Sequence, residues 1–275
     1  MKKILVPTDF SIAGKKAADY AVAFAELFNS KITLMHAYPP LMYDTDIAYF
    51  HQEALTLMKD VVVKKLELEK QRINKKLTTK ASGVFDEGYT KSAILLAMKK
   101  SHPNLVVMGT TGESVLEKNV FGSVSLGVVN ESKIPVLVVP EKAQSGKIKR
   151  IVYATDYHEG DAKAMKYLID LAAKLKAKIF VVHIANGDFS TSYEKDSMEA
   201  MKTTICKKHD CENISFQVIN GENTASELEK YCKKVNAGLL AVSNEKRSFF
   251  IKILLPSITK KMIYHSEIPL LVFAP

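Results

Sequence analysis

Three glycines and two serines lie close together where a valine-rich run gives way to a helical pattern. They are Gly109, Gly112, Gly122, Ser123 and Ser125. Glycine lets backbone N–H groups approach an anion closely, and the first N–H groups of a helix lack partners within it. Such a stretch can hold phosphate, with the serine hydroxyls as further donors. The alternative is a plain strand-to-helix turn whose helix is capped by serine.

Two common phosphate-binding motifs do not fit these glycines. A P-loop needs lysine after its last glycine, whereas Gly122 is followed by Ser123 and Val124. The dinucleotide fingerprint G-x-G-x-x-G follows a first strand, whereas here two residues separate Gly109 from Gly112 and the strand is a late one. If this stretch binds phosphate, it does so through a different pattern.

Other candidate site residues follow apolar runs that are typical of buried strands. Thr8 and Asp9 follow KILVP, and Ala37 ends ITLMHA. Because ligands of an open parallel sheet bind beyond the carboxyl ends of its strands, these residues should meet the glycine stretch in one crevice. A carboxylate such as that of Asp9 suits ribose hydroxyls. This convergence favours a phosphate cradle over a plain turn.

The chain repeats itself. KILVPTD near the start matches RIVYATD at an offset of 147 residues, from Asp9 to Asp156, and SKIPVLVVP matches SEIPLLVFAP. We therefore predict two domains, at 1–142 and 148–275, which we call the first and second copy. The polar stretch EKAQSGK is the predicted linker.

Each copy alternates short apolar runs with helical patterns, which predicts an α/β fold. In the first copy a long charged helix is expected over 51–79, a strand follows at about residue 81, and Thr90 is the expected cap of the next helix. Strands that alternate with helices form mostly parallel sheets covered on both faces. We expect two tandem, open, five-stranded sheets flanked by helices.

The pattern G-x2-G-x9-G-(S/T), together with VPTD after the first strand, resembles the universal stress protein family, here in tandem. The resemblance covers nearly the whole chain. It implies a Rossmann-like fold of the adenine nucleotide alpha hydrolase type and a pocket for ATP, with Mg²⁺, in the first copy. Thr8 and Asp9 would then face adenosine and its ribose, and Ala37 the adenine. The residues that would hold ribose and phosphates are Met108, Gly109, Thr110, Gly112, Gly122, Ser123, Val124 and Ser125.

The resemblance also implies partners. The final strands IPVLVVP and IPLLVFAP would pair across the two copies and make a pseudo-dimer inside one chain. A homodimer and an unidentified signalling partner remain open.

The second copy departs from the motif. Ser243, Lys246 and Pro256 stand where the first copy has its three glycines, and bulky Phe249 and Phe250 fill the spacer. We therefore predict that this copy does not bind ATP in the same way. Since the same fold forms there without glycines, the sequence suggests that a ligand, rather than the fold, explains the glycines of the first copy.

Composition excludes several classes of protein. The net charge of +9 permits an anionic partner, but the lysines are spread at helical spacing without interleaved aromatic residues, which argues against nucleic acid. No apolar run reaches the roughly 18 residues of a membrane span, and the start MKKILVPTDFS is a poor signal peptide. We expect a cytoplasmic protein.

Cysteine and histidine give weaker signals. Three cysteines, an odd and sparse count, argue against a disulfide framework. Cys206, His209 and Cys211 are close enough to share a metal, although a structural role is favoured. His36 and His183 could each pack in the core or line a pocket.

The leading hypothesis is a stress-response protein that binds ATP in its first copy, with a structural or regulatory second copy. No catalytic triad can be argued from spacing, and Asp9 is the one candidate general base, so binding is favoured over catalysis. The alternatives are a slow ATPase that acts as a switch and an interaction scaffold without nucleotide.

Overall fold

The protein is described by a computed structural model that covers residues 1–38, 48–110, 122–144, 147–158, 160–185, 191–243 and 267–274. Gly112 and the spacer with Phe249 and Phe250, along with Lys246 and Pro256, lie outside these residues.

Strands and helices alternate in both copies, as the sequence predicts. The elements of the first copy are β1 (Lys3–Pro7), α1 (Ile12–Phe28), β2 (Lys31–Tyr38), α2 (Ala48–Asn74), β3 (Ser82–Glu87), α3 (Thr90–Ser101), β4 (Leu105–Gly109), α4 (Ser123–Glu131) and β5 (Val136–Val139). Those of the second copy are β6 (Arg150–Ala154), α5 (Asp161–Leu175), β7 (Lys178–Ala185), α6 (Thr191–Cys206), β8 (Ile214–Asn220), α7 (Thr224–Lys234), β9 (Leu239–Ser243) and β10 (Leu270–Phe273).

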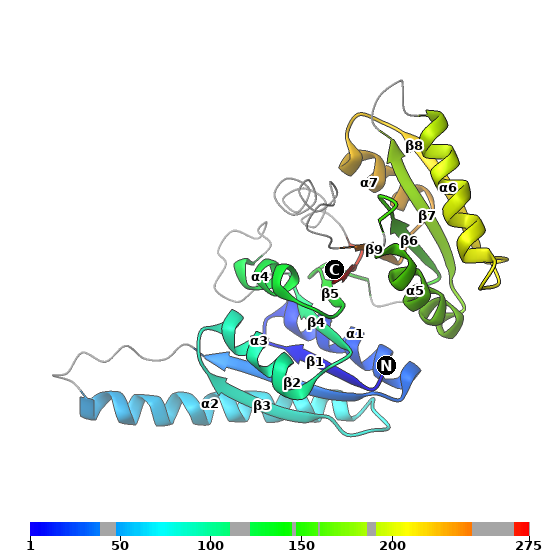
Figure 1. Cartoon of the computed structure of the whole chain (residues 1–275). Coiled ribbons are helices and arrows are strands. Elements are labelled where there is room, and N and C mark those ends of the chain that lie inside the picture. Colours follow the sequence, from blue (N-terminus) through cyan, green and yellow to red (C-terminus); the bar gives the residue numbers. More distant parts are fainter. Residues whose placement is uncertain are drawn as a thin grey trace.

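The ten strands form one continuous sheet in the order β3-β2-β1-β4-β5-β10-β9-β6-β7-β8 (Figure 1). Each copy contributes five strands, as expected, but the two tandem sheets are joined into one, so the number of sheets differs from the expectation. The copies join through β5 and β10, which pair antiparallel with Leu271 opposite Leu137, so the predicted pairing of the final strands is confirmed. A sheet edge exposes unpaired N–H and C=O groups, and the join removes one such edge from each copy.

Helices cover both faces of the sheet. One core packs α1, α2, α5 and α6 against the sheet, and the other packs α3, α4 and α7 against the opposite face. Because side chains alternate along a strand, Leu271 belongs to the first core and its neighbours Leu270 and Val272 to the second. Both cores therefore continue across the join of the two copies.

Local signals set the helix ends. Ser11 caps α1 by accepting a hydrogen bond from the Gly14 N–H at 3.1 Å, and Asn29 ends it in the left-handed conformation. Thr90 was expected to cap α3, but the cap position is Tyr89, which makes no side-chain cap bond, and Thr90 is the first helical residue. Its side chain is thus available for the crevice described below.

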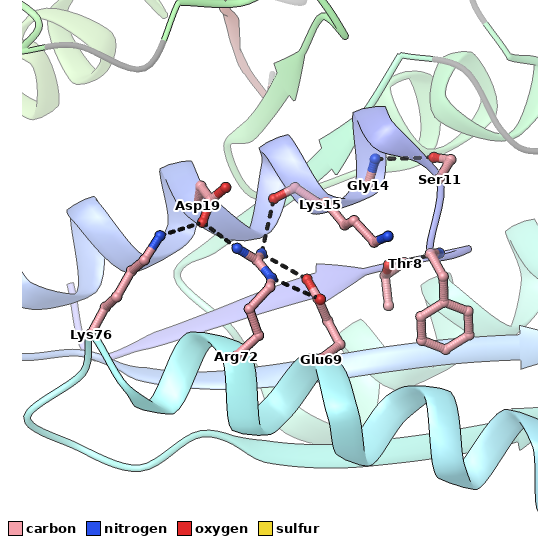
Figure 2. Close-up of polar contacts among 9 residues, drawn as sticks. Thr8, Ser11, Gly14, Lys15, Asp19, Glu69, Arg72 and Lys76 are labelled. Carbon is pink, nitrogen blue, oxygen red and sulfur yellow. Dashed lines mark hydrogen bonds and ion pairs between the residues drawn. The ribbon is translucent and has the colours of Figure 1, made fainter.

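An ion-pair network fastens α2 to α1 (Figure 2). Arg72 on α2 donates two hydrogen bonds to Glu69 and a third, of 2.7 Å, to Asp19 on α1. The Glu69 side chain is only 5% exposed, so its charge depends on this partner. Glu69 and Asp19 raise the pKa of Arg72, which keeps the guanidinium charged.

Cys206 and Cys211 form a disulfide at the turn between α6 and β8, with Cα atoms 5.6 Å apart. The cysteine count did not predict this bridge, because a single disulfide that closes a local turn is different from the disulfide framework that the count argued against. The third cysteine, Cys232, is free and buried. With both thiols oxidised, the proposed metal ligands are not available as thiolates, and the described residues contain no group of three or more metal-binding side chains.

Every helix within the described ranges is too short or too polar to cross a lipid bilayer.

Candidate functional site

A crevice opens at the carboxyl ends of β1, β2 and β4, beside the first turn of α4. We call it the first-copy crevice; its volume is about 210 Å³. The sequence-predicted residues that line it are Thr8, Asp9, Ala37, Met108, Gly109, Gly122, Ser123, Val124 and Ser125. Thr110 is buried and is not among the lining residues. Stretches from three parts of the sequence thus meet where an open parallel sheet places its ligands.

The structure adds lining residues that the motif did not identify. They are Pro7, Gly14, Met35, His36, Thr90 and Ile94. His36 was left open between packing and lining, and it does both. Its Nδ1–H donates to the Thr8 carbonyl over 2.7 Å, which fixes the ring, and the ring stacks on Phe10. The position of His36 at the end of a buried strand was the signal that pointed to it.

The turn after β1 is held by its own side chains. Asp9 accepts hydrogen bonds from the Ser11 N–H and hydroxyl, at 3.1 and 2.6 Å. Thr8 Oγ1 accepts from the N–H of Phe10, whose φ of 67° is left-handed. This conformation is rare for a residue with a side chain, and the polar contacts on both sides stabilise it. The Asp9 carboxylate is therefore fixed at the wall of the crevice.

Gly109 lies against the start of α1. A Cβ atom there would stand 2.8 Å from the Ala13 carbonyl carbon and 3.0 Å from the Gly14 nitrogen. The expectation that the fold does not need this glycine is therefore wrong for Gly109, because any side chain would push β4 and α1 apart. At Gly122 a Cβ would meet the Thr110 carbonyl oxygen at 3.3 Å, which is tight but less severe.

The first turn of α4 faces the crevice. Gly122 occupies the cap position before the helix, and it has no side chain that could bond the first N–H groups of α4. Ser123 is exposed at the opening, whereas the Ser125 hydroxyl donates to the Gly109 carbonyl over 2.8 Å. The early N–H groups of α4, together with the helix dipole, give this end a partial positive charge that suits an anion.

In the second copy, the described residues that match part of the crevice wall are hydrogen-bonded to one another. Asp161 stands where the first copy has Gly14 and is buried. It accepts hydrogen bonds from the Tyr153 hydroxyl at 2.5 Å and from the Thr155 hydroxyl. Tyr153 also lies 3.2 Å from the Ser243 hydroxyl, which replaces Gly109. Burial raises the pKa of Asp161 above its ordinary value, although the hydrogen bonds from Thr155 and Tyr153 oppose this shift.

His183, the counterpart of His36, is also enclosed in the second copy. Its Nδ1–H donates to the Thr155 carbonyl over 2.7 Å, and Nε2 lies 3.1 Å from a carboxylate oxygen of Glu194 on α6. The Tyr157 ring covers it at 4.5 Å. Burial is the main cause that raises the pKa of Tyr157, and the negative charges of Glu194 and Asp156 raise it further. The Tyr157 hydroxyl therefore stays protonated and neutral. Among its described residues, the second copy thus keeps the strand framework of the first and bonds polar side chains to one another at positions that match the wall of the crevice.

Comparison with known proteins agrees with this architecture. A model of the universal stress protein family matches residues 1–140 and again residues 147–274. A universal stress protein of Methanocaldococcus jannaschii is 31% identical over 145 residues, which are 50% of this chain and 81% of that protein. One from Mycobacterium bovis is 19% identical over 294 residues, 98% of this chain and 96% of that protein.

A solved structure shares the fold over almost the full length. The universal stress protein from Archaeoglobus fulgidus superposes with a TM-score of 0.73 at 20% identity, covering 99% of this chain and 98% of that one. With both halves of the chain matched by one family model, and with the crevice motif and the doubled sheet described above, this chain belongs to the universal stress protein family and carries two of its domains in tandem.

Proposed function

We propose that the first copy binds one ATP, with Mg²⁺, in its crevice, and that the second copy is a structural or regulatory partner with boundaries close to 148–275. The observation that carries this proposal is the meeting of Thr8, Asp9, Ala37 and the Gly109 region around one hollow at the first turn of α4. The hollow combines a carboxylate, strand ends and the start of a helix, which are the groups that ribose and phosphate require.

The chemistry assigns each side of the crevice to a part of the nucleotide. At about 210 Å³ the hollow is smaller than the roughly 300–1,000 Å³ of a pocket that encloses a whole ligand, so its apolar interior suits the nucleoside. Ala37 would contact the base, with Ile94 completing the apolar lining, and Asp9 would bind the ribose hydroxyls. The phosphates would lie at the opening, where Ser123 is exposed beside the N–H groups of α4.

The carboxylate in the crevice fits a magnesium ion that binds together with the phosphates. Mg²⁺ is held mainly by substrate phosphates and water, with one or two carboxylates at most. Asp9 is the one carboxylate among the described lining residues, and it already accepts two hydrogen bonds from Ser11. These bonds hold the carboxylate in place, and the proposal stops at binding rather than hydrolysis. Bound Mg²⁺ would neutralise part of the negative charge of the phosphates.

A Ser123→Asp substitution tests the proposal. An acidic residue in the first turn favours the helix, so the variant should fold, while its charge repels a phosphate placed there. We expect wild-type protein to bind one Mg-ATP per chain in calorimetry and the variant to bind at least about tenfold more weakly. The matched control is Ser226→Asp, which places the same charge in the first turn of α7, away from the crevice.

Two results would contradict the proposal. One is equal loss of ATP affinity in both serine variants, which would show that the charge acts without a defined site. The other is a protein that carries no adenine nucleotide in native mass spectrometry as purified and shows no heat of binding. The second result would favour the interaction scaffold.

A further inference from the structure

A second and larger cavity lies where the two copies meet. We call it the junction cavity; its volume is about 600 Å³, within the range of small-molecule sites. Tyr20 of α1 and residue Gln144 after β5 contribute one side. The amino ends of β6, β9 and β10 contribute the other, with the last turns of α7. It shares no lining residue with the first-copy crevice.

The charged lining residues carry an excess of positive charge. The cations are Lys147, Lys149, Arg150 and Lys233, against the carboxylates Glu229 and Glu267. Glu229 is 2.6 Å from Lys233, so these two charges compensate each other. Within the part of the chain that the structure describes, no carboxylate lies at ion-pair distance from the three cations between residues 147 and 150. The mouth of the cavity therefore favours an anion.

The remaining wall is apolar and uncharged. Ile148, Ala237 and Leu240 are buried there. Two groups that could ionise stay neutral, because burial raises the pKa of Tyr20 and raises that of the Cys232 thiol to about 12, with a further contribution from Glu229. A ligand would therefore meet a hydrophobic floor on one side and cationic groups on the other.

Close contacts preform this floor. Gly238 approaches the backbone of Ile148 so closely that a Cβ would stand 3.2 Å from its Cα. The Tyr20 hydroxyl donates to the Gln144 carbonyl over 2.7 Å, and the Gln144 side chain donates to Glu267 over 2.8 Å. These bonds tie the first copy to the second across the cavity. A preformed site loses less conformational entropy when it binds.

We propose that the junction cavity is a second ligand site, which takes a small amphipathic anion independently of the nucleotide. Its apolar or aromatic body would lie against Ile148 and Leu240, and its carboxylate, sulfate or phosphate group would face Lys149 and Arg150. Because both copies line the cavity, such a ligand stabilises their association, and any partner that loosens the join weakens its binding in return.

The probe is anilinonaphthalene sulfonate, a fluorescent aromatic anion, with phenylnaphthylamine as its uncharged analogue. We expect one sulfonate probe to bind per chain and Lys149→Glu to weaken it at least about tenfold, while the uncharged analogue changes little. Arg150→Gln is the second variant. Lys64→Glu on α2 is the matched control, an exposed lysine with the same change of charge, and should change affinity less than about twofold. Melting temperatures establish that each variant is folded.

The location of the probe can be read directly, because the chain contains no tryptophan. A single tryptophan at exposed Lys147 should transfer energy efficiently to the bound probe. A tryptophan in place of Phe85 on β3, at the far edge of the first copy, should transfer much less.

Three outcomes would overturn the proposal: equal weakening by Lys149→Glu and Lys64→Glu, equal energy transfer from the two tryptophans, or displacement of the probe by saturating Mg-ATP. The last would place the probe in the first-copy crevice. Since Ser123→Asp should leave probe binding unchanged, failure of the nucleotide proposal and failure of this one are distinguishable.

Discussion

At the scale of single residues, the residue that ends the fourth strand of each copy has a different role in each. Gly109 ends β4 against the backbone of α1, and Ser243 ends β9 at the corresponding place. The second copy accepts the larger residue, and its hydroxyl joins the buried network of Tyr153 and Asp161. The sequence identified nine of the described lining residues of the crevice, through the spacing of the glycines and the position of the others at strand ends. It could not separate a glycine that a ligand requires from one that packing requires, because that depends on a contact between distant elements.

Gly109→Ala should destabilise the protein even without nucleotide. The added methyl group would overlap the Ala13 backbone, and overpacking of this kind costs about 1–3 kcal/mol. Urea unfolding of the nucleotide-free protein measures this, and Ser243→Ala is the control with a smaller expected change. Unchanged stability with lost ATP binding would restore the ligand as the whole reason for this glycine.

Asp161→Asn should alter how stability depends on pH. Because burial raises the Asp161 pKa in the folded protein, the native state keeps a proton that the unfolded chain releases. The contribution of Asp161 to stability is therefore fully present below the ordinary aspartate pKa of about 3.9 and is lost as pH rises through the raised value. Asparagine does not titrate, so the wild type should lose stability relative to the variant between about pH 4 and about pH 7.

The measurement is urea unfolding at the two pH values. Exposed Asp170 lies on the same helix, and Asp170→Asn is the matched control that should leave the pH dependence as in wild type. The opposite trend, with wild type gaining relative to Asp161→Asn as pH rises, would show that the hydrogen bonds of Tyr153 and Thr155 outweigh burial.

At the scale of elements, patterns in the sequence predicted the type of each segment better than its ends. The long charged helix was expected over 51–79 and ends at Asn74. The Asn74 side chain accepts a hydrogen bond from the Ala81 N–H, which turns the chain into β3. The ion pair of Arg72 with Asp19 joins residues 53 positions apart, and no local pattern announces it.

Arg72→Met should weaken the attachment of α2 to α1. The change leaves the Glu69 carboxylate buried without its partner, and we expect a loss of about 1–3 kcal/mol in the free energy of unfolding. Replacing both members, as Arg72→Met with Glu69→Leu, should recover most of that loss. Lys202→Ala, which breaks an exposed pair with Glu199, is the control and should change little. No recovery in the double variant would contradict this account.

At the scale of the whole molecule, the resemblance to the universal stress protein family implied that the final strands of the copies pair, and they do. Two features lay beyond prediction. One is the continuity of both cores across the pairing of Leu137 with Leu271. The other is the junction cavity, whose walls come from segments as distant as Tyr20 and Pro269. Both arise from how the copies meet, and periodicity within one copy carries no information about that.

The two copies should stay together without the peptide link. If a protease site is inserted between Gln144 and Lys147 and cleaved, we expect both fragments to elute as one species in gel filtration, because the strand ladder and both cores persist. Uncleaved protein is the control. Separation of the fragments at micromolar concentration would mean that the linker, rather than the sheet, holds the copies together.

The antiparallel pairing of β5 with β10 also makes the two rims of the sheet different from each other. Strands of each copy run parallel to one another, so reversing direction between β5 and β10 puts the carboxyl ends of the first copy beside the amino ends of the second. The first-copy crevice and the junction cavity therefore open along one rim of the sheet, and the closed cluster around Asp161 lies on the other. Two identical subunits related by a twofold axis would have equivalent rims. This chain is directional instead: the two cavities found among its described residues lie along one rim of the sheet, and the buried Asp161 cluster lies at the other.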